Sequence, residues 1–183
     1  MVSTASDAVK VMSVITSWDF YINMLGNIVA GLLSGWVVTR YYRKRDAVKA
    51  YREKQYEIAG CAMNITCRVD DALFENSANG YERIYERISE ISKGISNISL
   101  EYLKTEKSNE YIKKMRENVT EIETALLTLS HKMHEKEVGS LYYMQNKKWM
   151  DEEITTNKEK LEKNSWELFH TADEFHTYII SNS

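Results

Sequence analysis

The sequence predicts an all-α protein in which a single N-terminal transmembrane helix is followed by a cytoplasmic antiparallel helical bundle with coiled-coil-like packing. Three observations support this prediction. Residues 24–38 are apolar and formally uncharged, and a run of basic residues follows directly at 40–45. Beyond residue 46, apolar residues recur every three or four positions, which is the spacing of helices packed on helices. The chain has no proline and no stretch that alternates apolar and polar residues as a strand would.

The apolar stretch is long enough to cross a membrane. A spanning helix needs roughly 20 residues, because each residue advances about 1.5 Å through a hydrocarbon core of about 30 Å. Aromatic residues that favour the headgroup boundary, Trp18 and Tyr41 among them, lie near both ends. A core helix of a soluble protein is the alternative, but no other segment is apolar enough to bury this one. We therefore predict a transmembrane helix at 18–42, after a short extracytoplasmic tail at 1–17.

The basic residues predict the orientation of this helix. Residues 1–39 contain one basic residue, Lys10, whereas residues 40–52 contain six. Basic residues beside a span stay cytoplasmic, so we expect the N-terminus outside the cell (inner) membrane and residues 43–183 in the cytoplasm. A cleaved signal peptide would instead have a basic start and small residues at a cleavage site. We expect Arg43, Lys44 and Arg45 to contact lipid headgroups.

One face of the predicted span carries small residues. Gly31 and Gly35 form a GxxxG pattern, and Asn27 lies four residues earlier on the same face. Small residues let two helix backbones approach closely, and an asparagine there can hydrogen-bond to its own copy. Small residues are also common in spanning helices that do not associate. We predict a homo-oligomer held by Asn27, Gly31 and Gly35.

The cytoplasmic helices are predicted at about 43–76, 81–104, 109–137 and 141–180. Turn-forming residues at 76–80, with Gly80 as a helix stop, and the Gly139 region separate them. Between the second and third helices the polar segment 105–109 suggests a turn capped by Ser108. The apolar phase continues across it, so one helix from 81 to 137 is the alternative. The predicted buried positions are Val48, Tyr51, Gln55, Ile58, Ala62, Ile65, Val69, Ala72; Tyr81, Ile84, Ile88, Ile91, Ile95, Ile98, Tyr102; Ile112, Met115, Val119, Ile122, Leu126, Leu129, Met133; and Ile154, Leu161, Leu168, Ala172, Phe175, Ile179, widened by Trp149, Trp166 and Phe169.

Several functional classes are disfavoured by the sequence. Residues 53–183 carry seven more acidic than basic residues, which argues against a nucleic-acid partner. His131 and His134 lie too far along the chain from His170 and His176 for all four to hold a zinc ion in a simple hairpin. There is no phosphate-binding glycine loop or nucleophile elbow, and we expect the two cysteines to be reduced core residues. We therefore predict no metal, no cofactor and no enzyme activity.

These inferences favour a single-pass membrane protein that acts by binding, scaffolding or sensing at the cytoplasmic face of the membrane. The membrane, a second copy of the chain and an unidentified cytoplasmic protein are its expected partners. The alternative is a membrane-perturbing effector, such as a toxin or an antiphage abortive-infection component. Asn23 and Asn27 motivate this alternative, because polar residues inside a membrane span often mark functional paths.

Overall fold

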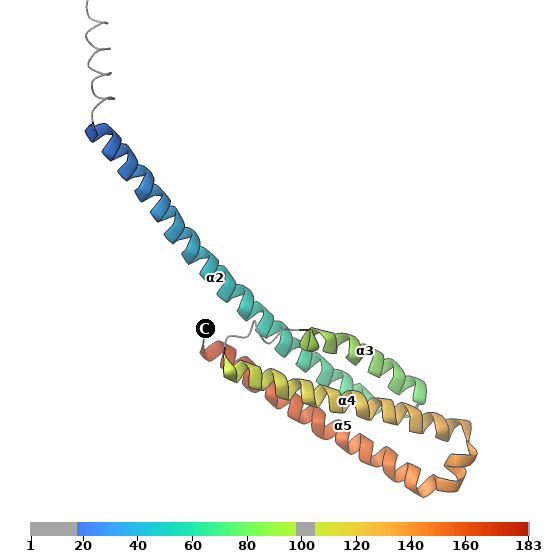
Figure 1. The fold of residues 1–183 in the computed structure, drawn as a ribbon. Helices are drawn as coiled ribbons and strands as arrows, with labels where there is room; N and C mark the ends of the chain where they lie inside the picture. The colour runs from blue at the N-terminus through green and yellow to red at the C-terminus, as the bar shows by residue number, and fades with distance from the viewer. Residues whose placement is uncertain (1–17, 98–104, 183) are drawn as a thin grey trace, which may run out of the picture. The chain divides into compact units, whose positions relative to one another are not determined.

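Helices account for nearly all of the chain that the structure describes. The structure is a computed structural model, and it describes residues 18–97 and 105–182. Over these ranges it contains four helices and no strand, which confirms the all-α class (Figure 1). The helices are α2 (Trp18–Leu73), α3 (Ala78–Ser96), α4 (Glu106–Val138) and α5 (Leu141–Ser181).

The chain divides into two compact units, residues 1–49 and residues 50–183. Helix α2 contributes to both of them. Residues 20–49 of α2, which belong to the first unit, are all exposed. The buried side chains that the structure describes all belong to the second unit, which therefore has a core of its own.

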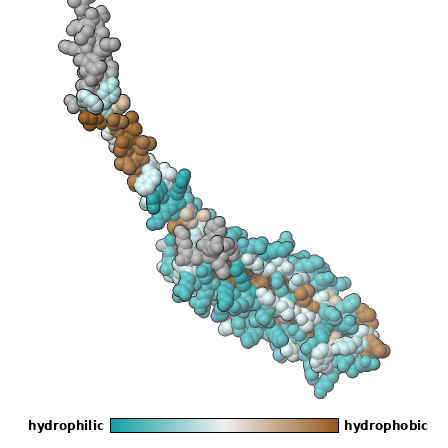
Figure 2. Space-filling model, in the orientation of Figure 1, coloured by the Kyte–Doolittle hydropathy of each residue, from teal (hydrophilic) through white to brown (hydrophobic). Residues whose placement is uncertain are grey.

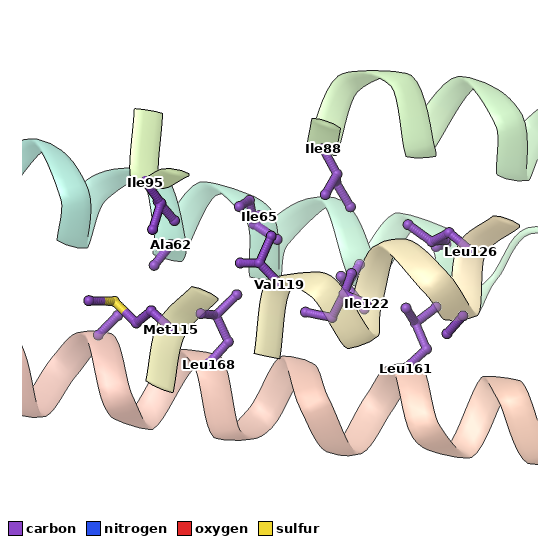
Figure 3. Close-up of a cluster of buried hydrophobic side chains, with 14 of the residues drawn as sticks. Ala62, Ile65, Ile88, Ile95, Met115, Val119, Ile122, Leu126, Leu161 and Leu168 are labelled. Atoms are coloured by element: carbon purple, nitrogen blue, oxygen red, sulfur yellow. The ribbon is translucent and has the colours of Figure 1, made fainter. Parts of the chain in front are cut away.

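The core of the second unit is built from all four helices. Its buried side chains form one cluster that runs from Ile58 to Ile179, and α4 packs directly against both α3 and α5. Figure 3 shows the side chains from the four helices converging on a shared interior: Ala62 and Ile65 of α2, Ile88 and Ile95 of α3, Met115, Val119, Ile122 and Leu126 of α4, and Leu161 and Leu168 of α5.

The connection between α2 and α3 differs from the prediction. Helix α2 ends at Leu73, and Ser77 caps α3 by accepting a hydrogen bond from the Gly80 backbone N–H at 3.1 Å. Gly80, which we expected to end a helix, therefore lies in the first turn of α3. A Cβ at this position would collide with the side chain of Glu75. The glycine leaves room for the Glu75 side chain and does not act as a helix stop.

The start of α4 also lies earlier than predicted. Thr105 is its N-cap, and the Thr105 hydroxyl accepts a hydrogen bond from the Ser108 backbone N–H at 3.3 Å. Ser108, the expected cap, is instead fully buried, and Gln55 of α2 donates a hydrogen bond to its hydroxyl at 3.0 Å. Helix α3 ends at Ser96, so α3 and α4 are two helices and not one.

Helices α4 and α5 are joined by a tight turn and lie side by side (Figure 1). Gly139 adopts φ of 61° and ends α4, and its backbone N–H donates to the carbonyl groups of the last turn. A left-handed residue at this position favours glycine. Ser140 then caps α5 by accepting from the Tyr143 backbone N–H at 3.1 Å. Asn146 interrupts the regular helix with φ of −118° and ψ of 23°.

The predicted buried positions agree with the structure only in part. In α3, Tyr81, Ile88 and Ile95 are buried, whereas Ile84 and Ile91 are partly buried. All seven positions in α4 are buried, and so are the six apolar positions in α5. In α2 the buried stripe begins at Gln55, because Val48 is exposed. The predicted widening in α5 is wrong, since Trp149, Trp166 and Phe169 are exposed while Met150, Asn157 and Ser165 occupy the buried stripe. Ile98 and Tyr102 lie outside the described residues.

The shared core gives a first prediction about stability. Ile122 is fully buried in α4, whereas Leu127 on the same helix is half-exposed. We expect Ile122→Ala to lower the free energy of unfolding by about 2–5 kcal/mol, because it leaves a cavity among side chains from several helices. Leu127→Ala should lower it by less than about 1 kcal/mol. Urea denaturation followed by circular dichroism measures both, and equal losses would contradict the core described here.

A second prediction concerns pH. The hydroxyl of buried Tyr81 donates to the Glu75 carbonyl at 2.6 Å, and burial, with the nearby Glu75 carboxylate, raises the pKa of Tyr81 to about 12. An unfolded tyrosine loses its proton near pH 10, so this contribution to stability is complete below pH 10 and is lost between about pH 10 and 12. The Tyr81→Phe variant should lack this loss, as urea denaturation at pH 9 and pH 11 would show.

Candidate functional site

Helix α2 is the helix, among the residues that the structure describes, that is long and apolar enough to cross a membrane. None of its most apolar stretch is buried inside the protein. Figure 2 shows this stretch as a brown band followed by a teal collar of basic residues. A largely apolar, exposed helix surface of this length is costly in water and favourable in lipid.

The exposed stretch has two different faces. Successive residues of an α-helix are rotated by about 100°, which places Asn27, Gly31 and Gly35 along one stripe. A Cβ added at either glycine would meet no atom of this chain within 4 Å. The bulky side chains of Val29, Leu32, Leu33 and Trp36 gather on the other side and line a common concavity there. The exposed stretch therefore presents a small face and a bulky face.

The small face of the apolar stretch carries two polar side chains, Ser34 and Asn27. The Ser34 hydroxyl donates a hydrogen bond to the Gly31 carbonyl at 3.0 Å, so it satisfies itself within the helix. Asn27 is exposed on the same face. The asparagine, unlike Ser34, has its side-chain amide available to a neighbour outside the chain.

The basic collar lies on the same helix, after the apolar stretch. Arg43, Lys44 and Arg45 are exposed and form no ion pair with any residue that the structure describes. The Arg40 guanidinium lies 5.2 Å from the Trp36 ring centroid, so this cation covers the aromatic ring at the edge of the apolar stretch. The structure places these predicted contact residues together, and their role toward lipid stays a prediction.

The histidines lie apart in the structure. His131 and His134 line a groove of about 500 Å³ between α3 and α4, together with Glu82, Glu86 and Glu135. His170 lies against Trp166 on α5, and His176 lies against Tyr56. Among residues 18–97 and 105–182, no three His, Cys, Asp or Glu side chains are arranged to hold a metal ion.

The two cysteines differ from the expectation of core residues. Cys61 is half-buried and Cys67 is exposed, and both are free thiols. Partial burial and the nearby Glu57 carboxylate raise the pKa of the Cys61 thiol. A raised pKa lowers the fraction of thiolate, so Cys61 is poorly suited to act as a nucleophile.

The sequence did not predict a group of exposed apolar side chains in the second unit. Phe74, Val138, Leu141, Tyr142 and Met144 are 52–86% exposed beside the two connections at 74–77 and 139–140. Figure 2 shows a brown patch at this end of the bundle. Contiguous exposed apolar patches mark contact surfaces. The signal in the sequence was the presence of large apolar residues directly beside turn formers.

No protein-family model matches this chain, and no curated protein and no solved structure matches it.

Proposed function

We propose that this chain is a single-pass membrane protein that self-associates through its span and works by binding, scaffolding or sensing at the cytoplasmic face of the membrane. The observation that carries this proposal is the exposed, uncharged stretch of α2, with its small face and its basic collar. Its cytoplasmic helices form an antiparallel bundle with coiled-coil-like packing, which would present binding surfaces close to the membrane. Anchoring raises the local concentration of such surfaces.

No catalytic role enters the proposal. The described residues include a thiol with a raised pKa and histidines that lie apart, and these features give no support to a nucleophile or a metal centre. The exposed apolar and aromatic side chains of the bundle favour contact with another protein.

The second candidate is a membrane-perturbing effector, favoured by two exposed asparagines in the apolar stretch, Asn23 and Asn27. In that case the full-length protein would depolarise the membrane or arrest growth when it is produced in bacteria. A scaffold of the kind proposed here would do neither, which separates the two functions.

The orientation gives a testable prediction. A reporter enzyme that works only in the cytoplasm should be active when it is fused after Ser183. A reporter that works only outside the cytoplasm should be active when it is fused to the N-terminus. Changing Arg43, Lys44 and Arg45 together to glutamate should weaken this preference, whereas the same changes at the exposed residues Lys113, Lys114 and Lys160, distant from the apolar stretch in sequence, should not. A C-terminus outside the cytoplasm would contradict the proposed topology.

Self-association through the proposed span gives another testable prediction. Gly31→Leu and Gly35→Leu should each reduce the crosslinked fraction of full-length protein in membranes, since a bulky side chain would separate the two backbones. Asn27→Leu should weaken association by about 0.6 kcal/mol, the average for a hydrogen bond between membrane helices. Leu32→Ala, on the bulky face, is the control. If Gly31→Leu and Leu32→Ala behave alike, the small face does not hold the oligomer.

A further inference from the structure

A groove between α2 and α5 exposes aromatic side chains on the outside of the bundle. The α2–α5 groove has a volume of about 370 Å³, and its walls include Asp70 and Leu73 of α2 and Glu162, Trp166, Phe169 and His170 of α5. Trp166 is 64% exposed and Phe169 is 46% exposed. Exposed tryptophan is rare on surfaces that face only water and common at the centre of binding sites.

The aromatic side chains of the groove are held in place by one another. The ring centroid of His170 lies 3.9 Å from that of Trp166 and 5.7 Å from that of Phe169. Their backbone lies on α5, a helix whose neighbouring positions Ser165 and Leu168 are buried in the core. A ring fixed in this way loses little conformational freedom when a ligand packs against it.

The charge of the groove is acidic and uncompensated. Asp70 and Glu162 form no ion pair with any residue that the structure describes. Their neighbours outside the groove behave differently: Asp71 pairs with Arg68 at 3.4 Å, and Glu167 pairs with Lys163 at 3.9 Å. Arg68 and Lys163 thus pair with carboxylates outside the groove and not with Asp70 or Glu162.

We propose that the α2–α5 groove binds a basic, amphipathic helical segment of a partner protein, with an arginine or lysine of that segment over Trp166. This inference rests on the proposed function, because it names the class of partner that a binding protein of this kind would hold. A cation is attracted to the face of tryptophan, and two unpaired carboxylates beside the ring add to the attraction. Phe169 and Leu73 supply apolar surface for the other face of such a helix.

The acidic charge of the α2–α5 groove also argues against a second copy of this chain as its occupant. If two copies met through this groove by a two-fold axis, each Asp70 and Glu162 would approach carboxylates of the same sign. Like charges across an interface are unfavourable and suppress such pairing. A basic segment has the complementary charge.

The test uses full-length protein in detergent micelles and a fluorescein-labelled helical peptide with arginine and leucine on one face. A matched peptide with glutamate in place of arginine is the negative probe. We expect the basic peptide to bind, with affinity that falls as salt rises, and the acidic peptide to bind at least tenfold more weakly. Trp166→Ala should weaken binding by about tenfold.

Matched variants separate the groove from its surroundings. The double variant Asp70→Asn/Glu162→Gln should weaken binding about tenfold and flatten its salt dependence, whereas Asp71→Asn/Glu167→Gln should change it less than about twofold. Trp149→Ala removes another exposed tryptophan of α5 and should have no effect. Circular dichroism would check that each variant keeps its helices.

Four results would overturn the proposal: no binding of the basic peptide, equal binding of the two peptides, equal effects of the two double variants, or a homodimer that Trp166→Ala abolishes. The last result would show that a second copy fills the groove. Crosslinking through the span is measured separately. Loss of peptide binding with intact span crosslinking would therefore reject the basic partner and leave the membrane-anchored oligomer standing.

Discussion

Burial of apolar surface is the constraint on which the rest of this structure depends, and helix α2 meets it in two ways. Between residues 55 and 72 the helix has one apolar stripe, and that stripe is fully buried against the other helices. Between residues 24 and 38 it is apolar on most of its circumference and entirely exposed. Contacts with other helices cover the apolar surface of a helix of the first kind, whereas lipid is the favourable surrounding for a helix of the second kind. The change of pattern along a single helix thus accounts for the folded core and supports the membrane anchor that we propose.

Much of the fold could be predicted because its stripes keep a strict spacing. The positions in α4 are buried without exception, from Ile112 to Met133. The exact ends of α3 and α4 were harder to predict, because contacts between distant residues act together with the local caps Ser77 and Thr105. Glu137 of α4 accepts a hydrogen bond from the Ala78 backbone N–H at 2.9 Å, and Gln55 of α2 donates to Ser108. The turn-forming residues by themselves do not indicate such distant partners. For this reason the predicted roles of Gly80 as a helix stop and of Ser108 as a helix cap are wrong.

The same difference between local sequence pattern and tertiary packing applies to the candidate sites. Composition alone indicated the apolar stretch and its basic collar, and the structure places Asn27, Gly31 and Gly35 on one exposed stripe. The α2–α5 groove could not be predicted, because Trp166 and Phe169 are apolar residues next to a buried stripe and resemble part of it. Ser165, a polar residue, takes the buried position instead. A spacing of three or four residues tolerates a shift of one position, and only the packing of α5 against α2 and α4 decides which side chain points outward.

We propose that α2 anchors the chain at a membrane and that the helical bundle offers aromatic and acidic surface for binding. The central claim is that the exposed stretch of α2 lies within the bilayer. Alkaline extraction of membranes from cells that produce the full-length protein tests this claim most directly, because high pH releases peripheral proteins and leaves spanning helices in lipid. The account predicts that the protein stays with the membrane pellet, and that replacing Leu25, Val29 and Leu33 with aspartate releases it. Release of the unaltered protein into the supernatant would contradict the claim.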